Sequence, residues 1–143
     1  MRVITGTARG RVLKTLEGED VRPTTDRVKE AVFSIIQFEI EGRRVLDLFA
    51  GSGQLGIEAL SRGAASATFV DMSKDSLSAV KYNLEHTKLG DNAKVVQTDA
   101  LSFLKLTKDK FDIVFLDPPY ASSLVVLSLI HISEPTRPEP ISY

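Results

Sequence analysis

A glycine-rich segment followed at a fixed distance by an acid could hold a nucleotide-like cofactor. Residues 51–56, Gly-Ser-Gly-Gln-Leu-Gly, form a complete G-x-G-x-x-G, and Asp71 lies 20 residues after Gly51. Glycines permit a sharp turn and a close approach of a ligand to the backbone, and a carboxylate after the next strand can accept hydrogen bonds from ribose hydroxyls. The pattern predicts a site for an adenosine-bearing cofactor. A tight turn with a surface acid is the structural alternative.

Asp47, in the apolar segment just before the glycines, bears on which cofactor this is. A carboxylate repels a pyrophosphate but attracts an ammonium group and a sulfonium. Asp47 therefore favours S-adenosylmethionine over a nicotinamide dinucleotide, and with it a methyltransferase over an oxidoreductase. A paired acid at a strand end is the alternative explanation.

A second constellation, Asp117-Pro118-Pro119-Tyr120, follows the apolar segment 111–116. Asp117 and the proline carbonyls can accept hydrogen bonds from an exocyclic amine, and Tyr120 can stack on the ring that carries it. This arrangement would aim the lone pair of the amine at an incoming methyl group, so that catalysis is positioning and electrostatics. A strand that ends in a proline turn is the structural alternative.

The elements that must position these residues alternate along the chain. Short apolar runs predict strands at 45–49, 67–71, 94–96 and 111–116, and helices are predicted at 55–60, 75–89 and 101–106. This alternation predicts an α/β fold with a mostly parallel sheet and helices on both faces. Ligands bind beyond the carboxyl ends of such strands, so the two constellations should line one crevice. Asp99 follows the third strand, where it could accept from an adenine amino group or cap the next helix.

The segment before the sheet contributes a helix and a basic ribbon. Val28, Ala31, Val32, Ile35 and Ile36 recur at helical spacing and predict one buried helix face. Residues 1–16 contain four basic residues and no acid, with β-branched runs around Gly6 and Gly10, which predicts a basic hairpin. A surface for nucleic acid and a solvated, protected edge are both consistent with this ribbon.

Composition sets the outer limits. The chain has 143 residues, 43% of them hydrophobic, which predicts one globular domain. A net charge of −1 excludes a generally polybasic binder, and the lack of cysteine excludes disulfides, zinc ribbons and thiol catalysis. Two histidines cannot build a histidine-rich metal site, so no metal is expected. The chain starts without an apolar leader, and its longest apolar stretch, 124–132, is far short of the ~20 residues that span a bilayer. A cytoplasmic protein is expected.

Three segments resemble a known family: Arg22-Pro-Thr-Thr-Asp-Arg-Val-Lys-Glu-Ala31, residues 47–64 and residues 111–120. In these the chain is similar to bacterial 16S ribosomal RNA guanine-N2 methyltransferases of the RsmD type, over residues 1 to about 127. The resemblance implies a Rossmann-like class I S-adenosylmethionine-dependent methyltransferase with a small N-terminal basic hairpin. It also implies a monomer that methylates the guanine usually numbered 966 in the RNA of the small ribosomal subunit.

The resemblance assigns roles to individual residues. Asp47, Gly51 and Gly53 would contact the methionine half of the cofactor, Asp71 the ribose, where the family usually has glutamate, and Asp99 the adenine. The whole predicted cofactor set is Asp47, Phe49, Gly51, Gly53, Asp71, Met72, Asp99 and Ala100. The predicted catalytic residues, which would hold the amine, are Asp117, Pro118, Pro119 and Tyr120. The residues expected to meet RNA are Arg2, Arg9, Arg11, Lys14, Arg22 and Arg27.

The end of the chain departs from the family, whose sheet has seven strands and whose chains are longer. Three prolines between residues 135 and 140 predict no regular structure there. The expectation is a methyltransferase domain over 1–127 that lacks its C-terminal strands, an atypical tail over 128–143, and an exposed edge at the strand 111–116. An inactive RNA-binding remnant and a methyltransferase acting on another nucleic-acid amine, such as adenine N6, remain as alternatives.

Overall fold

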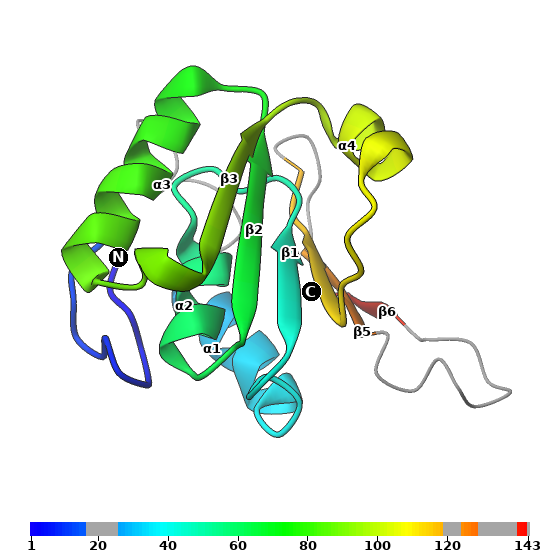
Figure 1. Ribbon diagram of the computed structural model, residues 1–143. Coiled ribbons are helices and arrows are strands. Elements are labelled where there is room, and N and C mark those ends of the chain that lie inside the picture. Colours follow the sequence, from blue (N-terminus) through cyan, green and yellow to red (C-terminus); the bar gives the residue numbers. More distant parts are fainter. Residues whose placement is uncertain (17–25, 119–123, 129–139, 143) are drawn as a thin grey trace, which may run out of the picture.

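Four parallel strands form the centre of the fold (Figure 1). The computed structural model describes residues 1–16, 26–118, 124–128 and 140–142. β1 (Arg44–Asp47) pairs in parallel with β2 (Ser66–Asp71) on one side and with β4 (Ile113–Leu116) on the other. β2 pairs in parallel with β3 (Ala93–Gln97). The strands predicted from the sequence are therefore present, with ends that shift by at most two residues.

Helices cover both faces of this sheet, as the alternation predicted. The helices are α1 (Asp26–Ile36), α2 (Gln54–Ser61), α3 (Lys74–Thr87) and α4 (Ala100–Leu106), with a short 3-10 turn, η2, at Gly90–Asn92. In Figure 1, α1, α2 and α3 lie on one side of the sheet and α4 lies on the other. None of the helices in the described ranges is long and apolar enough to span a membrane.

The pleat of the strands divides the core into two clusters, because successive side chains point to opposite faces. Val45 of β1 and Phe69 of β2 belong to the larger cluster, which includes the buried apolar side chains of α1, α2 and α3. Leu46 of β1 and Val70 of β2 belong to the smaller cluster, where they meet Phe103 of α4. The sheet is thus buried on both sides around its central strand.

The buried face of α1 differs from the prediction. Its buried residues are Lys29, Val32, Phe33 and Ile36, whereas Ile35 is 51% exposed. The apolar spacing had placed Ile35 on the buried face. Lys29 occupies that face because its ammonium group has a buried acidic partner on α2, Glu58, 3.2 Å away.

The N-terminal ribbon folds back on itself and packs on the helices. Arg2 and Val12 form an antiparallel bridge, and Val3 N donates to Arg11 O at 3.0 Å, so the predicted hairpin is present. Its turn contacts the C-terminal end of α2, where Thr7 N donates to Ser61 O at 2.8 Å. This ribbon comprises residues 1–16.

The sheet does not end at β4, which corrects the expected exposed edge. β5 (Val125–Ser128) pairs antiparallel with β4, and β6 (Pro140–Ser142) pairs antiparallel with β5, giving the order β3-β2-β1-β4-β5-β6. The expectation of no regular structure in the tail is therefore wrong at 140–142. Pro140 is compatible with this strand because β6 is the outermost of the described strands.

Candidate functional site

A pocket of about 390 Å³ opens at the carboxyl ends of β1, β2 and β3. It is lined by Leu48, Phe49, Asp71, Met72, Thr98, Asp99, Ala100 and Leu101. Each of the three strands contributes residues at or just after its last paired position, so the pocket lies where ligands bind in open α/β sheets. Its walls are mainly apolar, and its two carboxylates, Asp71 and Asp99, provide acceptors for hydroxyl and amino groups.

Asp71 connects two loops beneath this pocket. Its Oδ2 accepts from Gly51 N at 3.0 Å, and its Oδ1 accepts from Ser73 N at 2.8 Å. The carboxylate thus joins the glycine loop after β1 to the turn that starts α3. Each oxygen of an ionised carboxylate can accept a second hydrogen bond, so this role is compatible with a contact to ribose.

Asp99 is the N-cap of α4. Its Oδ2 accepts from Ser102 N at 3.1 Å. The pKa of Asp99 lies below its usual value, mainly because its carboxylate accepts a hydrogen bond from the side chain of Ser102, and also because it accepts one from the backbone of that residue. Of the two roles weighed from the sequence, the cap is present, and a contact to adenine stays a prediction for the same carboxylate.

The glycine loop makes the turn that its sequence suggested. Gly51 and Gly53 have φ angles of +57° and +87°, a region that other residues rarely adopt. A Cβ on Gly56 would lie 2.3 Å from Cε1 of Phe69, so this glycine lets α2 pack closely on β2. These are the turn and packing roles that the G-x-G-x-x-G pattern has in dinucleotide-binding folds.

Asp47 is buried beneath the loop and does not line the pocket. It is 1% exposed, and its Oδ2 accepts from Gly56 N at 3.1 Å in the first turn of α2. It therefore satisfies one of the backbone donors at the start of that helix. Gly51 and Gly53 are buried as well. A contact of these three residues with the methionine half of a cofactor stays a prediction.

The segment predicted to bind the amine begins beside this site. Asp117 follows β4 and is 8% exposed, and Pro118 is half-buried. β4 lies next to β1, where Leu48 N donates to Phe115 O at 3.2 Å. Asp117 is thus at the same end of the sheet as the pocket. Pro119 and Tyr120 lie outside the described residues.

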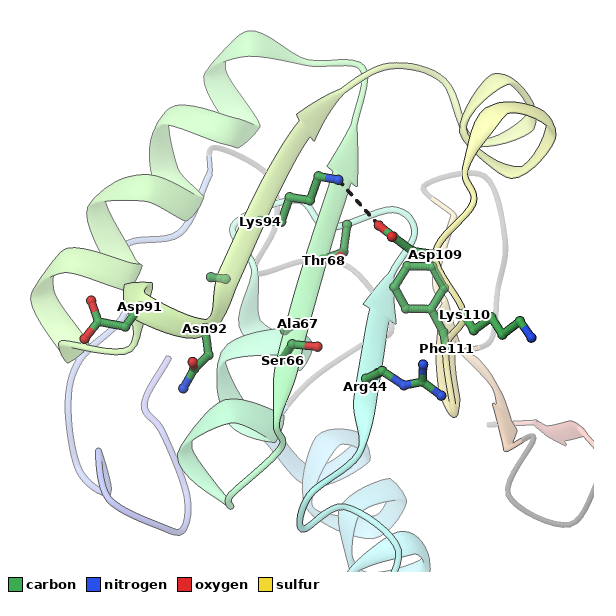
Figure 2. Close-up of a pocket in the computed structure, with 11 residues that line it drawn as sticks. Arg44, Ser66, Ala67, Thr68, Asp91, Asn92, Lys94, Asp109, Lys110 and Phe111 are labelled. Atoms are coloured by element: carbon green, nitrogen blue, oxygen red, sulfur yellow. Dashed lines mark hydrogen bonds and ion pairs between the residues drawn. The ribbon is translucent and has the colours of Figure 1, made fainter.

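A second cavity, of about 450 Å³, lies across the amino-terminal parts of the strands (Figure 2). Its lining includes Arg44, Thr68, Lys94 and Phe111, and the ion pair between Lys94 Nζ and Asp109 Oδ2, at 3.4 Å, extends across it. Both members of this pair are more than half exposed. None of the residues predicted to bind cofactor or amine lines this cavity, so its larger size does not make it the site.

Those residues of the predicted RNA-binding set that the structure describes do not line the pocket. Arg2, Arg9, Arg11 and Lys14 are exposed on the ribbon, and Arg27 is exposed in the first turn of α1. The ribbon's turn contacts Ser61, the last residue of α2, whereas the pocket lies at the end where α2 starts. In Figure 1 the blue N-terminal segment accordingly lies by the lower end of α3, away from α4. Arg22 lies outside the described residues.

Sequence reasoning missed three residues that line the pocket, namely Leu48, Thr98 and Leu101. Leu101 is 62% exposed and Met72 is 71% exposed, so two large apolar side chains flank the opening. The available signal was that Leu48, Thr98 and Leu101 each adjoin a residue of the predicted cofactor set in the sequence.

Comparison with known proteins identifies the family. A family model described as conserved hypothetical protein 95 matches residues 1–137. The chain belongs to this family, that of the RsmD-type methyltransferases. The match extends beyond residue 127, so the resemblance reaches further along the chain than the three motifs indicated.

Several relatives of this RsmD-type chain are named as ribosomal RNA methyltransferases. The ribosomal RNA small subunit methyltransferase D of Haemophilus influenzae is 40% identical over 148 aligned residues, with 100% of this chain and 77% of the relative covered. The protein of the same name from Escherichia coli is 44% identical over 125 residues, covering 87% of this chain and 63% of the relative. This chain thus spans about two thirds to three quarters of these relatives.

Solved structures agree on the fold. The Escherichia coli protein yhhF is 45% identical and superimposes with a TM-score of 0.77, covering 85% of this chain and 65% of that one. A methyltransferase structure complexed with S-adenosylhomocysteine is 25% identical with a TM-score of 0.59, covering 66% of this chain and 26% of that one. The RsmD-type chain therefore has the Rossmann-like class I methyltransferase fold.

Proposed function

We propose that this protein transfers a methyl group from S-adenosylmethionine to the exocyclic N2 amine of a guanine in 16S ribosomal RNA, at the position usually numbered 966. The observation that carries the proposal is the pocket at the carboxyl ends of β1, β2 and β3, with Asp117 and Pro118 at the end of the adjacent strand. The names of relatives that are 40% and 44% identical support ribosomal RNA as the substrate.

The pocket offers apolar walls and hydrogen-bond acceptors that fit the cofactor. Its apolar walls suit an adenine ring, and Asp71 and Asp99 suit the ribose hydroxyls and the adenine amino group. When bound, S-adenosylmethionine supplies a methyl group that is made electrophilic by a positively charged sulfur. Asp47, behind the glycine loop, favours positive charge in the adjoining region.

The protein's part in the reaction is to hold the amine. Asp117 and the carbonyl of Pro118 would accept hydrogen bonds from the guanine amine and so orient its lone pair toward the methyl carbon. The amine would form the nitrogen–carbon bond as the carbon–sulfur bond breaks, the electron pair of that bond would stay on the sulfur of S-adenosylhomocysteine, and one proton of the nitrogen would pass to solvent. No side-chain nucleophile is needed, because positioning and electrostatics lower the barrier. The guanine must be unpaired or flipped out to enter.

The ribbon supplies the expected contact with RNA phosphates through Arg9 and Arg11. The ribbon's turn contacts the end of α2 that is farther from the pocket, which implies that RNA extends along the helical face while one base reaches the site. Affinity for RNA should then fall as the salt concentration rises. The slope of the logarithm of affinity against the logarithm of salt concentration should become shallower when both arginines are replaced by glutamine. An unchanged affinity and slope in that variant would contradict the ribbon's role.

The decisive experiment incubates the purified 143-residue chain with S-adenosylmethionine and unmodified small ribosomal subunits, followed by mass spectrometry of the nucleosides. We expect N2-methylguanosine, and its loss in Asp117→Ala with cofactor affinity retained. Asp109→Ala, which removes an exposed acid before β4, is the matched control. Formation of N6-methyladenosine, or of no methylated nucleoside, contradicts the proposal. Equal loss of turnover and cofactor binding in Asp117→Ala would mean that Asp117 supports the fold instead.

A further inference from the structure

Asn83, in the middle of α3, connects the ribbon to the glycine loop. Its side chain is completely buried, and its Oδ1 accepts from Lys14 N at 2.7 Å. Its Nδ2 donates to Lys14 O at 2.9 Å and to Ser52 O at 2.9 Å. One amide therefore binds both backbone groups of a ribbon residue and a carbonyl of the loop between β1 and α2.

The glycine loop is held from two sides at successive residues. On the pocket side, Asp71 Oδ2 accepts from Gly51 N, and on the ribbon side, Asn83 binds the carbonyl of Ser52. Both neighbours of Ser52 are glycines, whose backbones adopt many conformations unless other groups fix them. A shift of Ser52 would move Gly51, and with it the hydrogen bond to the carboxylate that lines the pocket.

We infer that Asn83 is a positioning residue that holds the glycine loop in its cofactor-binding form and makes cofactor affinity depend on the ribbon. The inference rests on the proposed cofactor. It goes beyond the proposed function because it makes cofactor affinity depend on the ribbon, although no ribbon residue lines the pocket. The hydrogen bonds that connect the ribbon to the pocket run from the backbone of Lys14 through Asn83 to Ser52, and then from the neighbouring Gly51 to Asp71. By linkage, a ligand that alters the ribbon alters cofactor affinity, and the cofactor alters affinity for that ligand by the same factor.

The side chain of Lys14 is not part of this path. Its Nζ lies 5.5 Å from the centroid of the Tyr82 ring, on the outer side of α3, whereas the two bonds to Asn83 come from its backbone. This separation supplies a matched pair of variants. Lys14→Ala keeps both backbone groups, and Lys14→Pro removes the N–H that donates to Asn83.

The other ribbon contacts supply a second control. Ser61 Oγ accepts from Ala8 N at 3.0 Å and donates to Thr5 O at 2.6 Å, at the far end of α2 from the loop. Ser61→Ala therefore weakens the attachment of the ribbon without touching the glycine loop. A purely structural role for Asn83 would make Asn83→Leu resemble Ser61→Ala in every measurement.

The test is calorimetric titration of S-adenosylhomocysteine into the full chain, with the melting temperature of each variant measured in parallel. Asn83→Leu and Lys14→Pro are expected to weaken binding about tenfold or more, that is about 1.4 kcal/mol or more. Lys14→Ala and Ser61→Ala are expected to stay within about twofold, even where Ser61→Ala lowers the melting temperature. If Asn83→Leu does not fold, the difference in affinity between Lys14→Pro and Lys14→Ala tests the inference.

Two outcomes would overturn the inference, and they differ from failure of the proposed function. Wild-type affinity in both Asn83→Leu and Lys14→Pro would show that the loop does not depend on Asn83. Equal losses of affinity in Ser61→Ala and Asn83→Leu would reduce the effect to general stability. No binding by the unaltered chain would contradict the proposed cofactor, and the inference that rests on it would fall with it.

Discussion

Lys29 Nζ lies 3.2 Å from Glu58 Oε1, and both side chains are completely buried. Burial lowers the pKa of Lys29, and the charge of Glu58 opposes this effect. Glu58 also accepts from Ile4 N at 2.8 Å, from Thr5 N at 3.0 Å and from Arg62 Nε at 2.9 Å. A single carboxylate thus joins the ribbon, α1 and α2.

Replacement of this carboxylate should be strongly destabilising. Glu58→Ala leaves a buried ammonium group without its acidic partner and two ribbon N–H groups without their acceptor, so we expect a loss of about 3–5 kcal/mol in the free energy of unfolding. Urea unfolding at pH 7 measures it. The double variant Glu58→Leu with Lys29→Met removes both charges and should lose less. A loss below about 1 kcal/mol in Glu58→Ala would contradict this account.

Gly56 should not tolerate a side chain. Because Phe69 is completely buried, the Cβ of Gly56→Ala, 2.3 Å from Cε1 of that ring, must push α2 away from β2. We expect a loss of about 1–3 kcal/mol in thermal or urea unfolding, and partial recovery when Phe69→Leu is added. Gly90→Ala is the control, since the nearest atom to its Cβ is 3.9 Å away. Equal stability of the two alanine variants would refute the packing role.

The two roles of Asp99 can be separated by choice of substituent. Serine is also a good N-cap, so Asp99→Ser should preserve α4 but remove the carboxylate from the pocket, while Asp99→Ala should lose both functions. We expect both variants to bind S-adenosylhomocysteine more weakly, and only the alanine variant to melt at a lower temperature. Unchanged affinity of Asp99→Ser for S-adenosylhomocysteine would mean that Asp99 caps α4 and does not contact the cofactor.

Asp112 should make stability depend on acid pH. Burial raises its pKa, but hydrogen bonds from the backbone and guanidinium of Arg44 outweigh this and hold the pKa below 3.8. A carboxylate whose pKa is lower in the folded state stabilises above its unfolded pKa, and the contribution is lost as pH falls through the folded value. The stability difference between wild type and Asp112→Asn, below about 1 kcal/mol for so exposed a pair, should therefore shrink below pH 3.8.

Acid titrations followed by circular dichroism measure this dependence. Asp109→Asn, whose ion pair with Lys94 is more than half exposed, serves as the control. A difference that is constant from pH 7 to pH 2 would contradict the assignment.

The layered fold could be predicted from sequence because each element carries its own local pattern. Short apolar runs and the glycine loop indicated the parallel strands and their helices, and the spacing of Asp71 from Gly51 indicated one side of the pocket. These signals lie within a few residues or at a motif's fixed spacing. These positions could therefore be predicted from the sequence alone.

The parts that could not be predicted depend on distant partners. Lys29 is buried because Glu58, on another helix, supplies its charge, and a count of apolar spacing assigns Ile35 to that place instead. The apolar run at 124–132 did not reveal that β5 pairs antiparallel with β4, nor that Pro140 starts a strand beside it. Asn83 lies within a predicted helix, and only the fold brings it to both Lys14 and Ser52.

The order of strands also sets an order of assembly. β1, β2 and β3 pair in the order in which they are synthesised, and every residue that lines the pocket lies between the end of β1 and the first turn of α4. β4 then returns across the sheet to pair with β1, bringing Asp117 beside loops that precede it by more than one full strand–helix unit. This closure is a contact of long sequence separation, which forms slowly compared with local pairing. A nascent chain would thus complete the predicted cofactor pocket before the residues predicted to hold the amine.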